Sequence, residues 1–324
     1  MKHNLSKSRI LSGLQCRKRL YLQIHHPDYA ITNINTKARL HAGDVVGNIA
    51  RQLIPGGIFL DDSYTLRGAL EETTRLLTQQ NNAVIFEATF SASGLLVRGD
   101  ILYQKGSEYR LYEVKSSTGV KAYHLNDCAI QSWVMEQAGY PLTEIYLRHI
   151  NNQFVYSTPG NYEGLFKDEP ISQAIEGLKA QVPEWQAMCQ STLSGSLPDI
   201  EPGDHCNKPF PCPFKSHCCT EEQADYPVSS LPRAGKLSSQ LAEEGILTIG
   251  DIPENRLKSS KHKRVREAVL SGKAYIGPEA SIFINSLPYP RYYMDFETIS
   301  FAAPVWIGTR PYRQLPFQWS CHVE

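Results

Sequence analysis

The sequence lacks any uninterrupted run of about 18 apolar residues, the length that a helix needs to cross a bilayer. Its N-terminal stretch is basic, but it has neither a continuous apolar segment nor a small-residue cleavage site, so it is not typical of a secretion signal. Internal repeats and low-complexity segments are also missing. These absences predict a cytoplasmic protein without a membrane partner.

The chain also lacks an excess of charge of either sign, because 33 Lys and Arg residues balance 33 Asp and Glu residues. Net charge therefore gives no indication of a polyanionic partner, and a nucleic-acid surface would have to come from local basic clusters. What the chain does have is length and apolar content. Its 324 residues, 41% of them hydrophobic, suffice for one large domain or two to three smaller ones.

Hydrophobic periodicity predicts helices first, then a run of strands, then a mixture of both. The predicted helices cover 5–24, 36–54, 65–79, 121–138 and 173–191. The predicted strands cover 83–90, 94–104, 109–116, TEIYLRHI and NQFVYST. Helices, a meander, a helix and returning strands are the order expected of an α/β domain with a mixed sheet flanked by helices.

Charged residues lie on two neighbouring predicted strands, the second of which is otherwise apolar. Asp100 lies on one strand, and Glu113 and Lys115 share a face of the next because they are two residues apart. A hairpin at KGSE would place Asp100 across from them. Two carboxylates suit Mg²⁺, and a lysine beside the ion can stabilise charge that develops at a phosphate. The pattern indicates phosphodiester hydrolysis, whereas a surface hairpin with an ordinary Glu–Lys pair would explain the same residues.

Further polar residues favour the first interpretation. Glu87 interrupts the apolar strand VIFEATF, and the next helix presents His124, Asp127 and Gln131 as one polar stripe. The pattern FEATF…RGDIL…YEVKSS…HLNDCAIQ resembles the RecB-type branch of the PD-(D/E)XK nucleases.

That resemblance implies a restriction-endonuclease-like mixed sheet and a site that uses Mg²⁺ or Mn²⁺. It implies catalytic roles for Asp100, Glu113 and Lys115, with Asp100 and Glu113 as metal ligands. The family's helix glutamine falls on Gln131, and Glu87 is a further acidic residue of the site. The histidine that the family often carries on an early helix corresponds to Gly47 here, and its tyrosine after the glutamine corresponds to Met135.

Three of the eight cysteines, Cys206, Cys212 and Cys218, recur with five residues between each. Without a secretion signal disulfides are disfavoured, and a tight cysteine group is more often a metal site. A closed site needs four ligands, for which Cys16 is the best candidate, although Cys219 could replace Cys218.

This arrangement resembles the iron–sulfur staple of RecB-like and CRISPR-adaptation nucleases, in which one cysteine precedes the nuclease core and three follow it. The resemblance implies a [4Fe–4S] cluster. Zn²⁺ on the same ligands, helped by His205 or His217, stays open as an alternative.

Two patterns follow the cysteines. LAEEGILTIGDIP and the basic stretch after it resemble a helix–hairpin–helix DNA-binding element, although a solvated charged face would look the same. YYMDFET resembles the first motif of DEDD-type, RNase H-like exonucleases, which implies that Asp295 and Glu297 share a metal. Because the chain stops within the next strand-like run, we expect only the truncated beginning of that RNase H-like β segment.

The expected domains are therefore a nuclease domain with the cysteines at 1–225, a helix–hairpin–helix-like unit at 226–280, and the start of an exonuclease domain at 281–324. Together the patterns predict a metal-dependent deoxyribonuclease that acts on single-stranded DNA or DNA ends, in repair, recombination or defence. The alternative is a non-cutting DNA-binding module that holds iron–sulfur or zinc.

Overall fold

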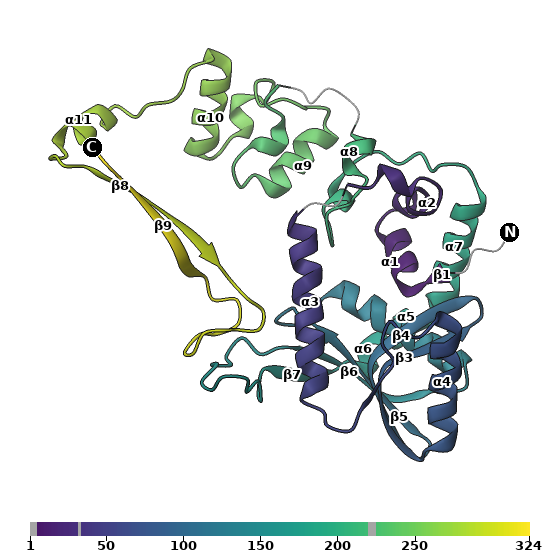
Figure 1. Cartoon of the computed structure of the whole chain (residues 1–324). Coiled ribbons are helices and arrows are strands. Elements are labelled where there is room, and N and C mark those ends of the chain that lie inside the picture. The colour runs from purple at the N-terminus through teal and green to yellow at the C-terminus, as the bar shows by residue number, and fades with distance from the viewer. Residues whose placement is uncertain (1–4, 32–33, 220–224) are drawn as a thin grey trace. The chain divides into compact units, whose positions relative to one another are not determined.

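A computed structural model describes residues 5–31, 34–219 and 225–324 (Figure 1). The chain divides into two compact units. The large unit comprises Met1–Cys218 and Thr298–Phe317, and the small unit comprises Cys219–Glu297 and Gln318–Glu324. Residues 220–224, which precede the expected domain boundary at 225, lie outside the described residues.

A mixed β-sheet lies at the centre of the large unit, and seven strands of the described residues belong to it. The order is β2-β3-β4-β5-β6-β7, with β1 paired in parallel to β4. Strands β3, β4 and β5 form an antiparallel meander, whereas β5 and β6 are parallel because a helix crosses between them. The strands are β1 (Leu5–Ser6), β2 (Ile58–Phe59), β3 (Asn82–Ala92), β4 (Leu95–Lys105), β5 (Glu108–Lys115), β6 (Leu142–Ile150) and β7 (Phe166–Pro170).

Helices cover both faces of this sheet. The helices of the large unit are α1 (Lys7–Gln15), α2 (Arg17–His25), α3 (Ile34–Gln52), α4 (Leu66–Gln79), α5 (Ala122–Gln137), α6 (Ser172–Lys179), α7 (Val182–Ser194) and α8 (Lys215–Cys218), with short 3₁₀ turns at Pro27–Tyr29 and Asp204–Cys206. Apolar residues of α1, α4, α5, α6 and α7 share the main core with one set of strand residues. Val46, Ile49 and Ala50 of α3 pack against the other set, which includes Phe86 and Ile101. The expected α/β fold with a mixed sheet flanked by helices is confirmed.

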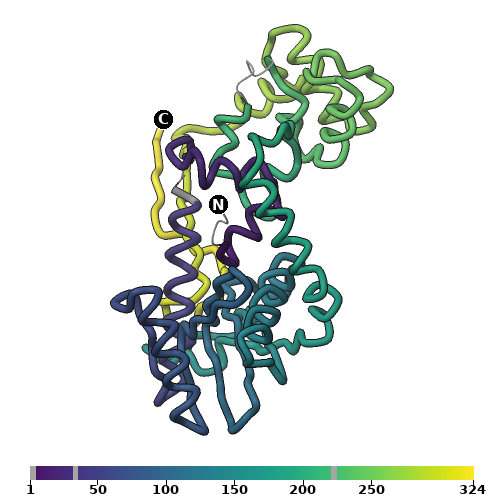
Figure 2. The backbone as a smooth tube through the Cα atoms, turned by 90° about the vertical axis from the view of Figure 1, so that its right-hand side faces the viewer, coloured from purple at the N-terminus to yellow at the C-terminus, as the bar shows by residue number. Residues whose placement is uncertain are grey.

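Segments far apart in the sequence meet beside the sheet. Figures 1 and 2 show α1 and α2 next to α7 and the chain that follows it. Gln15 fastens the two together, because its Nε2 donates to the carbonyl oxygens of His205 (2.7 Å) and Phe210 (2.8 Å). These two hydrogen bonds hold the N-terminal helices against the cysteine-rich loop.

Three predicted elements differ from the structure. The helix expected over 5–24 is broken at Cys16, whose backbone is extended (φ −165°, ψ 121°). The helix over 173–191 is broken into α6 and α7, because a proline at the start of α7 removes a backbone donor and favours a new first turn. The strand NQFVYST is wrong. Asn151 Oδ1 accepts from Gln153 N (3.2 Å) and starts a turn there, and Phe166–Pro170 pairs with β6 instead.

Residues 298–317 belong to the large unit. In the sequence they link strand β8 (Tyr292–Ile299) to strand β9 (Leu315–Val323), and these two strands pair with each other. Ala302 and Ala303 are buried in the same core as Val46 and Ile150. Tyr156 fixes the segment further, since its N–H donates to Thr309 O (3.0 Å) and its carbonyl accepts from Gly308 N (2.8 Å).

The small unit is largely helical. Its core contains Leu241, Ile249, Ile252 and Leu257, which are almost fully buried. Its helices are α9 (Gly235–Glu243), α10 (Ser260–Ser271) and α11 (Ala280–Ser286), with 3₁₀ turns at Val228–Ser230 and Glu254–Arg256. Among all described residues, no helix is both long and apolar enough to cross a membrane.

The start of α5 holds a buried histidine that yields a pH test. His124 is 1% exposed, and its Nδ1 accepts from Lys121 N (3.2 Å). Burial, with Lys115 adding to it, lowers the pKa of His124 from 6.5 to about 4. The unfolded chain therefore binds more protons than the folded chain between these pH values, so stability must fall as the pH falls from about 6.5 towards 4.

We expect His124→Asn, which keeps an acceptor but cannot titrate, to remove about 2–3 kcal/mol of this pH dependence. Urea unfolding of both proteins across this pH range measures it. His41→Asn, at an exposed histidine, is the matched control and should follow the wild type. Parallel stability curves for His124→Asn and the wild type would contradict the assignment.

Candidate active site and cysteine group

Three carboxylates lie in a row across neighbouring strands of the large unit. Phe86 and Ala88 pair with Ile101 and Gly99, so Glu87 on β3 and Asp100 on β4 occupy facing positions. Ile101 pairs with Tyr112, so the same register leads from Asp100 to Glu113 on β5.

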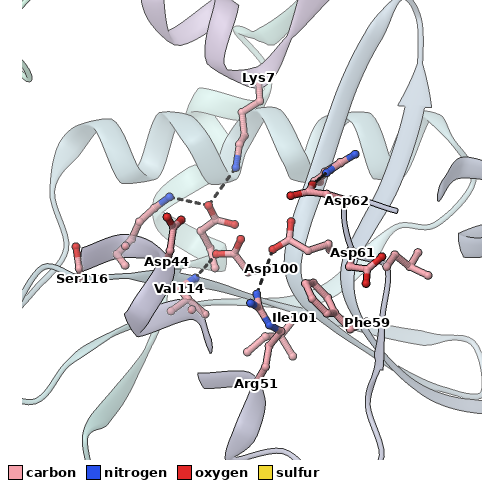
Figure 3. Close-up of a pocket in the computed structure, with 17 residues that line it drawn as sticks. Lys7, Asp44, Arg51, Phe59, Asp61, Asp62, Asp100, Ile101, Val114 and Ser116 are labelled. Atoms are coloured by element: carbon pink, nitrogen blue, oxygen red, sulfur yellow. Dashed lines mark hydrogen bonds and ion pairs between the residues drawn. The ribbon is translucent and has the colours of Figure 1, made fainter. Parts of the chain in front are cut away.

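Glu87, Asp100, Glu113 and Lys115 all line one cavity of about 610 Å³. The structure therefore brings these four expected residues together. Figure 3 shows Asp100 near the middle of this cavity.

The backbone is distorted where the row crosses β3. Glu87 has φ 58°, a conformation that is uncommon for a residue other than glycine. Before it, Ile85 faces the main core and Phe86 faces α3, but after it Ala88 again faces the main core. The alternation of the strand thus slips by one position at Glu87. Because of this irregularity the Glu87 carboxylate faces the cavity, whereas strict alternation would have turned it away. Backbone strain of this kind clusters at functional sites.

Four charged side chains form a closed ring beside the carboxylate row. Lys115 Nζ donates to Glu113 Oε1 (2.6 Å) and Asp127 Oδ2 (2.7 Å). Lys7 Nζ bridges the same two carboxylates, at 3.1 Å from Glu113 Oε1 and 2.8 Å from Asp127 Oδ1. The side chains of Glu113 and Asp127 are only 2% and 7% exposed. Since the charges alternate around the ring, each carboxylate is paired twice where water cannot solvate it.

Lys7 is a site residue that sequence reasoning missed. It is the first residue of α1 and precedes Glu113 by 106 residues. Figure 3 shows its side chain reaching from its helix towards the carboxylates. Ser6 caps α1, its Oγ accepting from Arg9 N (3.4 Å), and thereby orients this first turn. The basic N-terminal stretch was the one visible signal, and it does not indicate which lysine turns inward.

Gln131 donates hydrogen bonds to both carboxylates of the ring. It is fully buried, and its Nε2 donates to Glu113 Oε2 (2.8 Å) and more weakly to Asp127 Oδ1 (3.3 Å). Gly99 makes room for this packing, because a Cβ there would lie 2.6 Å from a methyl carbon of Leu111 and 3.6 Å from Gln131 Oε1. Gln131 therefore orients Glu113 rather than lining the cavity.

The carboxylates divide into two electrostatic classes. Burial and the charge of Glu113 raise the pKa of Asp100 well above its ordinary value and also raise the pKa of Glu87. Burial would likewise raise the pKa of Asp127, but Lys115 and Lys7 outweigh it and hold the pKa below its ordinary value. For the two lysines, Asp127 and Glu113 outweigh burial and raise each pKa. Asp127 therefore stays paired, whereas the cations near Asp100 and Glu87, including Arg51 beside Glu87, do not offset burial and the charge of Glu113.

That deficit is what a divalent cation would relieve, and hard carboxylate oxygens suit Mg²⁺ or Mn²⁺. Asp100 Oδ2 accepts a short hydrogen bond from Val114 N (2.6 Å), which leaves its other oxygen for a ligand.

The walls of the cavity combine cations, an aromatic ring and further carboxylates. Arg51 Nη1 lies 3.5 Å from Glu87 Oε1, and its guanidinium covers the ring of Phe59 at 4.2 Å. Asp44, Asp61 and Asp62 also line the cavity and are labelled in Figure 3. Gly47 also lines the cavity, so the position expected to correspond to the family histidine faces the site.

The four expected cysteines also meet. Cys16, Cys206, Cys212 and Cys218 line one small cavity, together with Arg19. Cys212 N donates to Cys206 O (2.8 Å), and all eight cysteines are free thiols. Burial raises the pKa values of Cys212 and Cys218. The positive charges of Arg19 and Lys18 partly offset this by lowering the pKa of Cys212 and of Cys218, respectively. Four thiols around one cavity are the donor set of an iron–sulfur cluster or of zinc.

Among the residues that the structure describes, no three His, Cys, Asp or Glu side chains are arranged to hold a metal ion. Asp295 and Glu297 lie two residues apart on the exposed strand β8, outside the large unit. The expected metal role of this pair stays a prediction.

Comparisons with known proteins add little. A family described as "Domain of unknown function (DUF2779)" matches residues 292–324. No curated protein matches the chain. One solved structure to which it is similar is described as "Crystal structure of SSO0001", with 13% identity, a TM-score of 0.28, and coverage of 59% of this chain and 78% of that chain. The family match spans a small part of the chain, and so weak a structural likeness carries no argument about function.

Because Asp100 is buried beside Glu113, we expect its replacement to raise the stability of the metal-free protein and to remove metal binding. Asp100→Asn keeps the acceptor for Val114 N but removes a buried charge. We expect it to stabilise the metal-free protein at pH 7, because it removes the buried charge whose pKa burial and Glu113 raise. We also expect it to abolish stabilisation by Mn²⁺.

Denaturant unfolding and thermal shifts with and without Mn²⁺ measure both effects. Asp168→Asn, which breaks a bidentate pair with Arg148 away from the cavity, is the matched control and should destabilise while keeping the Mn²⁺ response. An Asp100→Asn protein that is less stable and still responds to Mn²⁺ would rule out the metal site.

Proposed function

We propose that the large unit is a metal-dependent deoxyribonuclease that hydrolyses phosphodiester bonds in single-stranded DNA or at DNA ends. The observation that carries the proposal is the meeting of Glu87, Asp100 and Glu113 with Lys115 in one open cavity. A structural ion pair would need neither three carboxylates in a row nor two whose pKa values are raised. The resemblance of these residues to the RecB-type PD-(D/E)XK nucleases supports the same conclusion.

Each residue has a distinct part in this chemistry. Asp100 and Glu113, with Glu87 beside them, would hold Mg²⁺ or Mn²⁺, and the ion when bound supplies Lewis acidity and a more acidic water. Lys115 holds positive charge at the cavity wall, where it can stabilise charge that develops on the phosphate. Lys7 pairs with Glu113 and Asp127 alongside Lys115, and it helps to hold the pKa of Asp127 below its ordinary value. Gln131 fixes the orientation of Glu113.

The four thiols support a second part of the proposal. Cys16, Cys206, Cys212 and Cys218 would hold a [4Fe–4S] cluster, or Zn²⁺ as the alternative, and so join the N-terminal helices to the loop after α7. The same thiols favour a second candidate function, a non-cutting DNA-binding module in which the metal is structural. A helix–hairpin–helix role for the small unit, a second metal at Asp295 and Glu297, a cytoplasmic location, and a part in repair, recombination or defence are proposed on the sequence patterns.

Cleavage of DNA tests the first candidate. We expect the full chain to degrade a fluorescent single-stranded oligodeoxynucleotide with Mg²⁺ or Mn²⁺ but not without them. Lys115→Ala should lower kcat by about 100- to 1,000-fold, the cost of losing a group that stabilises transition-state charge. Lys7→Ala should lower it less, by roughly tenfold, because Lys115 still pairs with Glu113 and Asp127.

Lys105→Ala, at an exposed lysine where β4 meets β5, is the matched control and should cut like the wild type. Full activity of Lys115→Ala would refute the site. A wild type that binds the strand without cutting it would favour the second candidate.

Metal analysis of anaerobically purified protein tests the thiol site. We expect about four iron atoms and four sulfides per chain, with the brown colour of an iron–sulfur cluster. Cys16→Ser and Cys212→Ser should each lose the metal and lower the melting temperature. Cys321→Ser, at a cysteine of β9 outside the group, should keep both. One zinc per chain would select the alternative, and unchanged metal content in Cys16→Ser would remove this cysteine from the site.

A further inference from the structure

A basic cavity adjoins the carboxylate site. About 620 Å³ in volume, it is lined by Ser117, Thr118, Lys121, Asn152, Arg310, Pro311, Tyr312 and Arg313, all of the large unit. Three of these residues are cationic and none is acidic, although the chain as a whole carries no net charge. Basic residues therefore cluster at this cavity, although the overall composition does not reveal it.

The two cavities follow one another along a single stretch of backbone. Glu113, Val114, Lys115 and Ser116 line the carboxylate cavity, and the next two residues, Ser117 and Thr118, line the basic one. Consecutive Cα atoms are about 3.8 Å apart, so adjacent residues of one backbone stretch line the two cavities. A chain molecule with a reacting group among the carboxylates would reach the basic cavity with its next units.

The arginines come from far along the sequence and are held in place. Tyr312 OH donates to the carbonyl oxygen of Ser116, at the point where the two cavities meet. The backbone pairs of Tyr156 with Gly308 and Thr309 fix the residues just before Arg310. Arg313 N donates to Arg310 O (3.2 Å), which closes a turn that presents both side chains.

The cations of this cavity are available to a ligand. Within the described part of the chain, Lys121, Arg310 and Arg313 form no ion pair with a carboxylate, unlike Lys7 and Lys115 next door. Arg310 donates to Gln153 Oε1 (3.3 Å), a neutral partner that leaves its charge uncompensated. Three cations beside the hydroxyls of Ser117 and Thr118 and the amide of Asn152 suit phosphate groups.

We propose that this basic cavity binds the sugar–phosphate backbone of a single nucleic-acid strand next to the phosphate that is cut. This inference rests on the proposed nuclease function and adds a substrate site to it. It also gives a role to part of the segment that matches the domain of unknown function, since Arg310 and Arg313 lie within residues 292–324. The expected ligand is a flexible polyphosphate rather than an isolated anion, because the basic cavity and the carboxylate cavity are lined by consecutive residues of one backbone stretch.

Binding without cleavage tests the inference. The full chain is titrated with a fluorescein-labelled oligodeoxythymidylate in buffer free of divalent ions, and anisotropy is followed at several salt concentrations. We expect Arg310→Gln and Arg313→Gln each to weaken binding about five- to tenfold at about 50 mM salt. Each should also reduce the slope of log K against log salt by about 0.7, the contribution of one phosphate contact to a single strand. Cleavage by these variants should show a raised KM with little change in kcat.

Lys105→Gln removes the same charge from the exposed turn between β4 and β5 and is the matched control. Binding by both arginine variants that equals the wild type would overturn the inference. So would an equal loss in Lys105→Gln, which would indicate general charge attraction, or competition by polyglutamate as strong as that by unlabelled strand.

The outcomes separate the inference from the function on which it rests. A wild type that cleaves, with arginine variants that bind normally, refutes the basic cavity alone. A wild type that binds through Arg310 and Arg313 but never cleaves refutes the nuclease and keeps the cavity as a strand-binding site.

Discussion

The ring of Lys7, Glu113, Lys115 and Asp127 is the constraint on which the arrangement of the large unit depends. Two carboxylates that are almost fully buried are tolerable only because two lysines pair with both of them. Removing one member of such a network typically costs about 3–5 kcal/mol, because the remaining charges stay buried without a partner. The ring therefore requires α1, β5 and α5 to meet at one point.

Helix α1 connects this ring to the cysteine group. Lys7 is its first residue, and Cys16 directly follows its last. Gln15, on the last turn, donates two hydrogen bonds to the loop that carries Cys206 and Cys212. Whatever holds the four thiols thus also positions the end of a helix whose other end supplies a lysine to the candidate active site. In the proposed function, the metal at the thiols would stabilise the site mechanically rather than take part in its chemistry.

The carboxylate row shows how this fold combines stability with binding. The ring is balanced in charge, whereas Glu87 and Asp100 are crowded by Glu113, and the pair of Glu87 with Arg51 does not offset this crowding. The positive φ of Glu87 adds backbone strain at the same place. Unfavourable charge and strain that the structure tolerates together are expected where a ligand compensates for them. The neighbouring basic cavity has the opposite imbalance, so in the proposed function the two cavities would take the metal and the phosphates of one substrate.

The sequence by itself determined the fold class, the strands that carry Asp100, Glu113 and Lys115, and the choice of Cys16 as the fourth cysteine beside Cys206, Cys212 and Cys218. These follow from local periodicity and residue chemistry, which are readable over short stretches. The break at Cys16, the inward turn of Glu87, the entry of Lys7 and the basic cavity of Arg310 and Arg313 were decided only by the tertiary structure. Each depends on groups about 100 or more residues apart, or on a backbone irregularity that packing imposes, and no local pattern encodes either.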